Sequence, residues 1–262
     1  MNLDYSPGLR ITYQAAWVPA PQGTILMIHG SGGDHTKWTG LMQRLPQGFN
    51  GLALDLPGHG LSSLPLCASI EEMAEFVRQA IETINPPRPL VLAGHSMGAA
   101  VCLQMAIEYG ELLDGIVLIG GGSRLRVLPA LLKTLQEGSV DPNFFRAGFA
   151  DDTPEETKER EVANYAQVST RILYADFNAC DHFDVSSRLG QVKVPALIIV
   201  GEEDRLAPPK YSHYLHENIA GSILKVIPNT GHFILLEKAD QVSQAVRDFC
   251  SRFPTSFRGN RD

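Results

Sequence analysis

The chain has 262 residues, of which 44% are hydrophobic and 19% charged, with 24 glycines and 17 prolines. This composition is typical of a folded protein rich in turns and excludes a disordered chain, a coiled coil and a collagen-like protein. The net charge of −7 would repel a polyanion, so we expect no nucleic-acid partner. The length suits one large α/β domain, with two small domains as the weaker alternative.

The cysteines and the amino terminus indicate a cellular compartment. Cys67, Cys102, Cys180 and Cys250 lie far apart, without the Cys and His spacing of a zinc site, so we expect reduced, mostly buried residues and no metal. Residues 1–8 lack the basic and apolar regions of a secretory signal. No apolar run approaches the roughly 18 residues of a membrane span. We therefore expect a cytoplasmic protein with no membrane span.

Short apolar runs bounded by glycine and proline alternate with longer amphipathic patterns, which is typical of a parallel sheet built from βαβ units. Strands are expected at residues 11–16, 25–29, 51–54, 90–93, 115–119, 196–200 and 224–227. Helices are expected from about Ser69, over residues 97–109, from about Pro209 and from about Ala239. Ser69 and Glu72 have the spacing of a capping box, which predicts where the first of these helices begins.

One long segment interrupts this alternation, because residues 121–190 contain no strand-like run. Helical patterns occur there at residues 129–136 and from Pro154 onward, the second behind another capping-box pair, Thr153 and Glu156. A stretch of this length is unusual as a plain loop. We therefore expect a helical insertion, with residues 1–120 and 191–262 forming the core domain.

A serine motif, GHSMG at residues 94–98, directly follows the predicted strand 90–93 and directly precedes a helical pattern. This context is the one that a nucleophile elbow requires. Side chains in place of Gly94 and Gly98 would clash at such a sharp turn. The turn lifts the Ser96 hydroxyl to the carboxyl edge of the sheet, at the amino terminus of a helix, where negative charge is favoured. The alternative interpretation is a tight turn with an incidental serine.

A serine nucleophile needs a general base, and the base needs an orienting carboxylate. The apolar run 196–200 ends in acidic residues, of which Asp204 is the preferred candidate and Glu202 and Glu203 are alternatives. His232 follows the next predicted strand on a loop. Because parallel strands bring their carboxyl ends to one edge, Ser96, Asp204 and His232 are expected to converge.

Two N–H donors are needed to stabilise a tetrahedral intermediate. One is expected from Met97, directly after the serine. The other is expected from the loop HGSGG at residues 29–33, with the Ser31 amide as first choice and Gly32 as second. This loop has neither GxGxxG nor GK[ST], which disfavours a phosphate cradle. Residues predicted to contact substrate are Gly30, Gly32 and Phe233.

These segments together resemble the α/β-hydrolase fold superfamily, in its capped branch of esterases and lipase-like enzymes. The motifs that carry the resemblance are HGSGG at 29–33, DLPGHG at 55–60, GHSMG at 94–98, GEEDRLAP at 201–208 and NTGHF at 229–233. The resemblance implies an α/β fold with an eight-stranded, mostly parallel sheet flanked by helices and a helical cap, residues 121–190, inserted after strand 6. It implies these site residues: Ser96 as nucleophile, His232 as base, Asp204 as acid, and the amides of Ser31 and Met97 as oxyanion donors. Residues 120–123, the family's alternative position for the acid, contain none.

The function expected from the residues and the resemblance is a serine hydrolase that cleaves a carboxylic ester of a small, partly apolar molecule through an acyl-enzyme, without a metal or organic cofactor. The same triad acting on a lactone, a thioester or a C–C bond, or in cofactor-free perhydrolysis, is the alternative. A non-catalytic binding protein on this fold is the weaker one. Aromatic residues of the insertion either line the acyl pocket or pack the insertion onto the core: Phe144, Phe145, Phe149, Tyr165, Tyr174 and Phe177. The sequence does not predict an oligomeric state.

Overall fold

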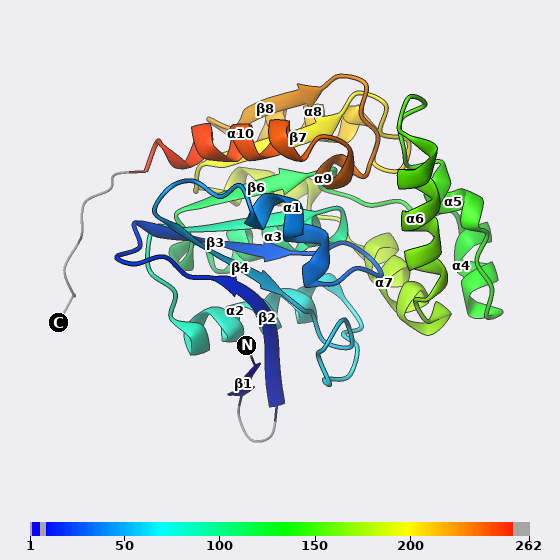
Figure 1. Cartoon of the computed structure of the whole chain (residues 1–262), viewed down its shortest axis with the longest axis horizontal. Coiled ribbons are helices and arrows are strands. Elements are labelled where there is room, and N and C mark those ends of the chain that lie inside the picture. Colours follow the sequence, from blue (N-terminus) through cyan, green and yellow to red (C-terminus); the bar gives the residue numbers. More distant parts are fainter. Residues whose placement is uncertain (1, 6–8, 254–262) are drawn as a thin grey trace.

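A central sheet organises the chain, whose computed structural model describes residues 2–5 and 9–253 (Figure 1). Its eight strands follow the order β1-β2-β4-β3-β5-β6-β7-β8. They are β1 Asn2–Tyr5, β2 Leu9–Ala16, β3 Gly23–Ile28, β4 Phe49–Leu54, β5 Leu90–His95, β6 Gly115–Ile119, β7 Ala196–Gly201 and β8 Ile223–Ile227. Strands β1 and β2 pair antiparallel with their neighbours, and every pair from β4 to β8 is parallel. The predicted fold class and all seven predicted strands are confirmed, and β1 is the eighth.

Helices cover both faces of this sheet, which explains why its central strands read as continuous apolar runs. Every residue of β3, β4, β5, β6 and β7 is buried. The flanking helices are α1 Thr39–Met42, α2 Ile70–Ile84, α3 Met97–Glu108, α8 Pro209–Asn218, α9 Ile234–Glu237 and α10 Ala239–Cys250. Side chains of α2, α3 and α8 join the hydrophobic cluster on one face, and those of α1, α9 and α10 join the cluster on the other.

Helix α2 begins as the capping-box pattern predicts, with one difference in detail. The Ser69 hydroxyl accepts a hydrogen bond from the Glu72 N–H at 3.3 Å. The Glu72 carboxylate reaches one residue further back and accepts from the Ala68 N–H at 2.7 Å. Two N–H groups at the helix start are satisfied in this way, which stabilises the helix end next to the core.

The segment 121–190 runs between β6 and β7 and contains four α-helices: α4 Pro129–Gln136, α5 Pro142–Arg146, α6 Glu155–Ala166 and α7 Thr170–His182. Figure 1 shows them gathered beyond one end of the sheet. The capping box predicted at Thr153 and Glu156 is wrong. Helix α6 begins at Glu155 behind Pro154, which offers no capping side chain. The Thr153 hydroxyl instead donates to the Glu237 carboxylate at 2.6 Å, on the core side of the molecule.

Two further predictions concern the cysteines and membrane spans. Cys102, Cys180 and Cys250 are buried, Cys67 is half-buried, and all four are free, so their predicted burial is confirmed. Within residues 2–5 and 9–253, none of the helices is long and apolar enough to cross a membrane.

Candidate active site

Ser96 occupies the turn between β5 and α3 in a strained backbone conformation, with φ 55° and ψ −116°. Such a conformation persists only where surrounding contacts impose it, and functional sites are where it is usually found. A Cβ on Gly94 would lie 2.1 Å from the Gly98 carbonyl oxygen, and one on Gly98 would lie 2.2 Å from the Ile28 carbonyl oxygen. Both glycines are therefore required by the close approach of backbone segments, as the sequence predicts.

Asp204 and His232, which are 28 residues apart in the sequence, are in direct contact. His232 Nδ1 lies 2.8 Å from Asp204 Oδ2, and both side chains are buried. The other carboxylate oxygen of Asp204 accepts the backbone N–H groups of Leu206 at 3.0 Å and Ala207 at 2.8 Å. A carboxylate held in this way accepts the Nδ1 proton of the imidazole, which leaves Nε2 as the basic nitrogen.

The two alternative acids lie elsewhere. The Glu203 carboxylate accepts the backbone N–H of Asp151 at 3.1 Å, and Glu202 is exposed on the surface. Neither shares a hydrogen bond with His232 among the described residues. The geometry therefore favours Asp204 as the partner of His232.

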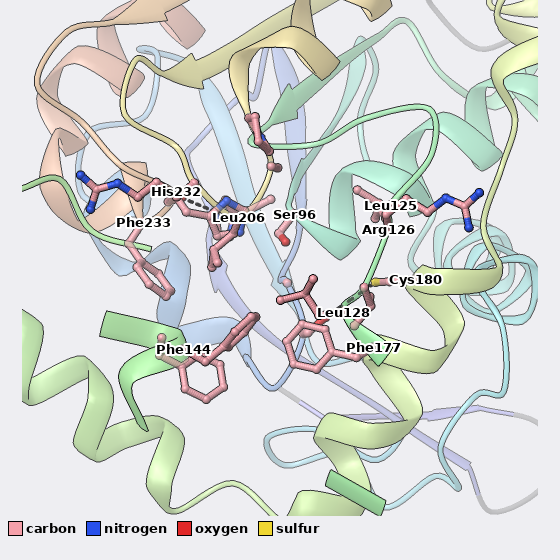
Figure 2. A pocket seen from close by; sticks show the side chains of 18 of the residues that line it. Ser96, Leu125, Arg126, Leu128, Phe144, Phe177, Cys180, Leu206, His232 and Phe233 are labelled. Atoms are coloured by element: carbon pink, nitrogen blue, oxygen red, sulfur yellow. Dashed lines mark hydrogen bonds between the residues drawn. The ribbon is translucent and has the colours of Figure 1, made fainter. Parts of the chain in front are cut away.

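Ser96 and His232 line one cavity of about 340 Å³. Figure 2 shows both side chains directed into this space. In the part of the chain that the structure describes, no hydrogen bond joins the Ser96 hydroxyl to His232. Catalytic hydrogen bonds of unliganded enzymes are often long and tighten only in the substrate complex. The absence of this hydrogen bond is therefore compatible with proton transfer from Ser96 to His232.

His95, next to Ser96, fixes the backbone of the His232 loop. Its Nε2–H donates to the His232 carbonyl oxygen at 2.8 Å, and the two rings lie 4.9 Å apart. Burial and the neighbouring His232 lower the pKa of His95 to about 3, so its ring is neutral at pH 7. From the other side, the His232 N–H donates to the Gly148 carbonyl oxygen at 2.5 Å. The His232 loop is therefore held by both the core and the segment 121–190.

The loop at residues 29–33 approaches Ser96 closely. A Cβ on Gly30 would lie 3.1 Å from the Ser96 Cβ, so a side chain here would require Ser96 or the loop to shift by a few tenths of an ångström. Among the described residues, no acceptor is bound by the N–H of Ser31 or of Met97. The Gly32 N–H, in contrast, donates to Asp176 Oδ2 at 2.7 Å. Gly32, the second choice for an oxyanion donor, is therefore already engaged.

Of the residues predicted at the site, Gly30, Ser31, Ser96, His232 and Phe233 line the cavity, whereas Gly32, Met97 and Asp204 do not. Of the predicted aromatic residues, Phe144, Phe145, Tyr165 and Phe177 line it, and Phe149 and Tyr174 do not. Phe149 packs instead against Phe233, with ring centroids 4.4 Å apart. Aromatic residues of the segment 121–190 thus both line the cavity and pack against the core.

Other residues that were not predicted from the sequence also line the cavity, among them Leu125, Arg126, Val127, Leu128, Cys180 and Leu206. Residues 125–128 follow β6 at the edge of the sheet where Ser96 lies. This position in the chain order could have predicted that they line the cavity. Figure 2 shows Leu206 and Leu125 on opposite sides of Ser96, with the Arg126 guanidinium pointing away from it. Arg205, also in the lining, is paired with Asp151 at 2.7 Å. The surroundings of the serine are therefore mainly apolar.

The described residues contain no group of three or more His, Cys, Asp or Glu side chains arranged to hold a metal ion. Around the cavity lie a strained serine, a buried histidine and carboxylate pair, and two backbone N–H groups that have no acceptor among the described residues. This arrangement suits nucleophilic attack on a carbonyl carbon.

Comparison with known proteins identifies the class. The sequence profile of the Alpha/beta hydrolase family matches residues 25–245. The chain therefore belongs to this family, and it is a hydrolase.

Individual relatives share less than a third of their aligned residues with this chain. The chain is 26% identical over 245 residues to the pimeloyl-[acyl-carrier protein] methyl ester esterase of Neisseria meningitidis, covering 86% of this chain and 92% of that protein. It is 28% identical over 240 residues to protein ABHD8 of Mus musculus, covering 86% of this chain but only 54% of that protein. A solved structure of a thermophilic esterase is 31% identical, with a TM-score of 0.81, and the match covers 96% of this chain and 97% of that one.

Proposed function

We propose that the chain is a serine hydrolase that cleaves the carboxylic ester of a small, partly apolar molecule through an acyl-enzyme. The observation that carries this proposal is the position of Ser96, strained at its turn, on the same cavity as His232, whose Nδ1 lies 2.8 Å from Asp204. Two relatives described as esterases, at 31% and 26% identity, support the choice of an ester.

In the proposed reaction, His232 Nε2 takes the hydroxyl proton of Ser96 as Oγ attacks the ester carbonyl carbon. The same nitrogen then protonates the leaving alcohol, and Ser96 is left acylated. A water molecule, deprotonated by His232, attacks the acyl group and releases the carboxylic acid. Asp204 remains ionised throughout and holds the imidazole in the correct tautomer and orientation.

The N–H groups of Ser31 and Met97 are the proposed donors to the tetrahedral oxyanion. Both belong to segments next to Ser96, and neither has an acceptor among the described residues. Unused donors in a water-poor site stabilise developing negative charge without reorganisation, and losing one costs about 3–4 kcal/mol of transition-state stabilisation.

We also propose that the segment 121–190 is the cap of this enzyme and selects the substrate. It contributes much of the apolar lining, including Phe144, Phe145 and Phe177. A volume of about 340 Å³ is at the small end for ligand sites, which suits a small ester. A neutral substrate is favoured because Arg205 is already paired and Arg126 points away from Ser96.

The proposal is tested with a fluorophosphonate probe and p-nitrophenyl butyrate. The unmodified protein should be labelled, and Ser96→Ala should abolish labelling and lower kcat by about 10⁶-fold. Asp204→Asn should lower kcat by about 10⁴-fold, because the histidine then adopts the wrong tautomer. Ser123→Ala is the matched control, since this buried serine bonds Ser186 at 3.0 Å and does not line the cavity.

Labelling that persists in Ser96→Ala would contradict the proposed nucleophile. Esters of increasing acyl length, with lactones and thioesters beside them, identify the bond that is cleaved. A lactone or thioester hydrolysed with a higher kcat/KM than every ester would replace the ester in the proposal while retaining the triad. An unlabelled protein that cleaves none of these substrates would contradict the proposed acyl-enzyme reaction.

A further inference from the structure

Helix α7 presents one face to the loop that carries the proposed oxyanion donor Ser31. Leu173, Asp176 and Cys180 are spaced three and four residues apart, so they lie on the same side of the helix, and all three are buried. A Cβ on Gly32 would lie 2.5 Å from Leu173 Cδ2, and Cys180 Sγ lies 3.8 Å from the Ser31 hydroxyl oxygen. The helix therefore packs directly on this loop.

Asp176 is fully buried and makes the polar contact in this interface. Its Oδ2 accepts the Gly32 N–H at 2.7 Å and lies 2.9 Å from His59 Nε2. Its Oδ1 has no hydrogen-bond partner among the described residues. Leaving a buried carboxylate oxygen unpaired costs stability, so stability alone does not explain why an acid stands here.

His59 completes the contact as a buried cation. Its Nδ1 lies 3.0 Å from the Pro57 carbonyl oxygen, and its Nε2 faces the Asp176 carboxylate. Both partners only accept hydrogen bonds, so both ring nitrogens carry protons. Burial lowers the pKa of His59, but the hydrogen bond and charge of Asp176, with smaller contributions from the Pro57 carbonyl and from Asp55, outweigh burial and raise it. The nearby His29, 4.8 Å away, is neutral because burial lowers its pKa to about 3.

The Gly32 N–H belongs to the peptide group whose orientation defines the turn. The turn spans residues 30–33, closed by a 3.0 Å hydrogen bond from the Gly33 N–H to the Gly30 carbonyl oxygen. Gly32 has φ 64°, as expected for the third residue of a type II turn. Type I and type II turns differ by a flip of the central peptide, which is the one that contains the Gly32 N–H. A hydrogen-bond acceptor at the Gly32 N–H therefore favours one of the two orientations of the central peptide.

We propose that Asp176 is a positioning residue for ester hydrolysis: it holds the central peptide of this turn and thereby fixes the backbone of Ser31, whose own N–H, in the preceding peptide, is the proposed donor to the tetrahedral oxyanion. This inference rests on the proposed function. It assigns the segment 121–190 a part in transition-state stabilisation in addition to shaping the cavity. Asp176 does not touch the substrate, because it lies outside the cavity lining.

The test compares kcat and KM for p-nitrophenyl butyrate, together with thermal unfolding, in Asp176→Ala and Asp176→Asn. Removal of an oxyanion donor typically costs 10²–10³-fold in kcat, and we expect about 10–100-fold from a misdirected one, with KM changed by less than about threefold. Asp176→Asn retains an oxygen that can accept from Gly32, so it should recover most of the lost kcat. Asp181→Asn is the matched control on the same helix, because it keeps an oxygen for the Val127 N–H, which the Asp181 carboxylate accepts at 3.0 Å, and it does not contact the turn.

The double variant His59→Leu/Asp176→Leu is used if Asp176→Ala does not unfold cooperatively. Replacing both partners of a buried ion pair by apolar residues is often neutral for stability, while the Gly32 acceptor is still lost. A folded Asp176→Ala or double variant with the kcat of the unmodified protein would overturn the positioning role alone. An unmodified protein without Ser96-dependent ester cleavage would overturn the proposed function and this inference with it.

Discussion

Gly120 is the residue at which a single methyl group tests the proposed histidine and carboxylate pair. It follows β6 with φ 56°, and its N–H donates to the Ile199 carbonyl oxygen at 2.9 Å. A Cβ at this position would lie 3.3 Å from both Asp204 Oδ2 and His232 Nδ1. We predict that Gly120→Ala leaves the protein folded but lowers kcat.

Two effects of this substitution have different magnitudes and different readouts. An alanine with left-handed backbone costs about 1–2 kcal/mol, which corresponds to a fall in Tm of about 2–8 °C for a chain of this size. The new methyl group also forces the Asp204 and His232 side chains to shift by a few tenths of an ångström. Because catalysis is sensitive to such displacements, kcat should fall about tenfold.

Gly221→Ala separates the two effects. Gly221 has φ 71°, and a Cβ there would meet no atom within 4 Å among the described residues. It should therefore reproduce the loss of Tm without the loss of kcat. Thermal unfolding and steady-state hydrolysis of p-nitrophenyl butyrate, measured well below both Tm values, provide the comparison. Equal kcat values in the two variants would refute the argument that the methyl group acts on the pair.

Two more predictions concern residues that hold the His232 loop. The Glu237 carboxylate accepts the N–H groups of Ala150 at 3.0 Å and Gly231 at 3.1 Å. Glu237→Gln should therefore lower the free energy of unfolding in urea by about 1–3 kcal/mol. An unchanged urea midpoint would contradict this prediction. His95 has a pKa of about 3 when folded and about 6.5 when unfolded. Between these values the unfolded chain binds one more proton at this ring, so stability falls by about 1.4 kcal/mol per pH unit as the pH decreases. His95→Gln should make the slope of unfolding free energy between pH 6 and pH 4 shallower by that amount, and identical slopes would contradict the prediction.

Much of the core was predictable because burial on both faces of the sheet and the conformation of sharp turns each require a recognisable sequence pattern. Strands covered on both sides require continuous apolar runs, and the runs at β5 and β7 are followed by Ser96 and Asp204. Gly94 and Gly98 were predictable for a similar reason, since a sharp turn between adjacent elements permits no side chain there. Features set by neighbouring residues within one or two elements are therefore recoverable from the sequence.

Other features depend on contacts between distant segments. Helical periodicity in α7 shows that Leu173, Asp176 and Cys180 share a face, but not that this face lies on the turn at residues 30–33. The capping box at Thr153 failed for the same reason, because Glu237, 84 residues away, binds the Thr153 hydroxyl. Residues 125–128, beyond the end of β6, line the cavity together with Ser96, which follows β5.

In the proposed enzyme, the segment 121–190 contributes to the reaction through two loops of the core as well as through its apolar lining. Its Gly148 carbonyl oxygen accepts the N–H of His232, and its Asp176 carboxylate accepts the N–H of Gly32. One contact fixes the loop of the proposed base, and the other fixes the turn beside the proposed oxyanion donor. Because differential stabilisation of the transition state depends on the positions of both groups, a displacement of this segment should lower kcat even when the substrate remains bound. In the proposed enzyme, one segment thus lines the cavity and holds both loops, so a mutation within α7 that changes the substrate range is expected to alter kcat together with KM.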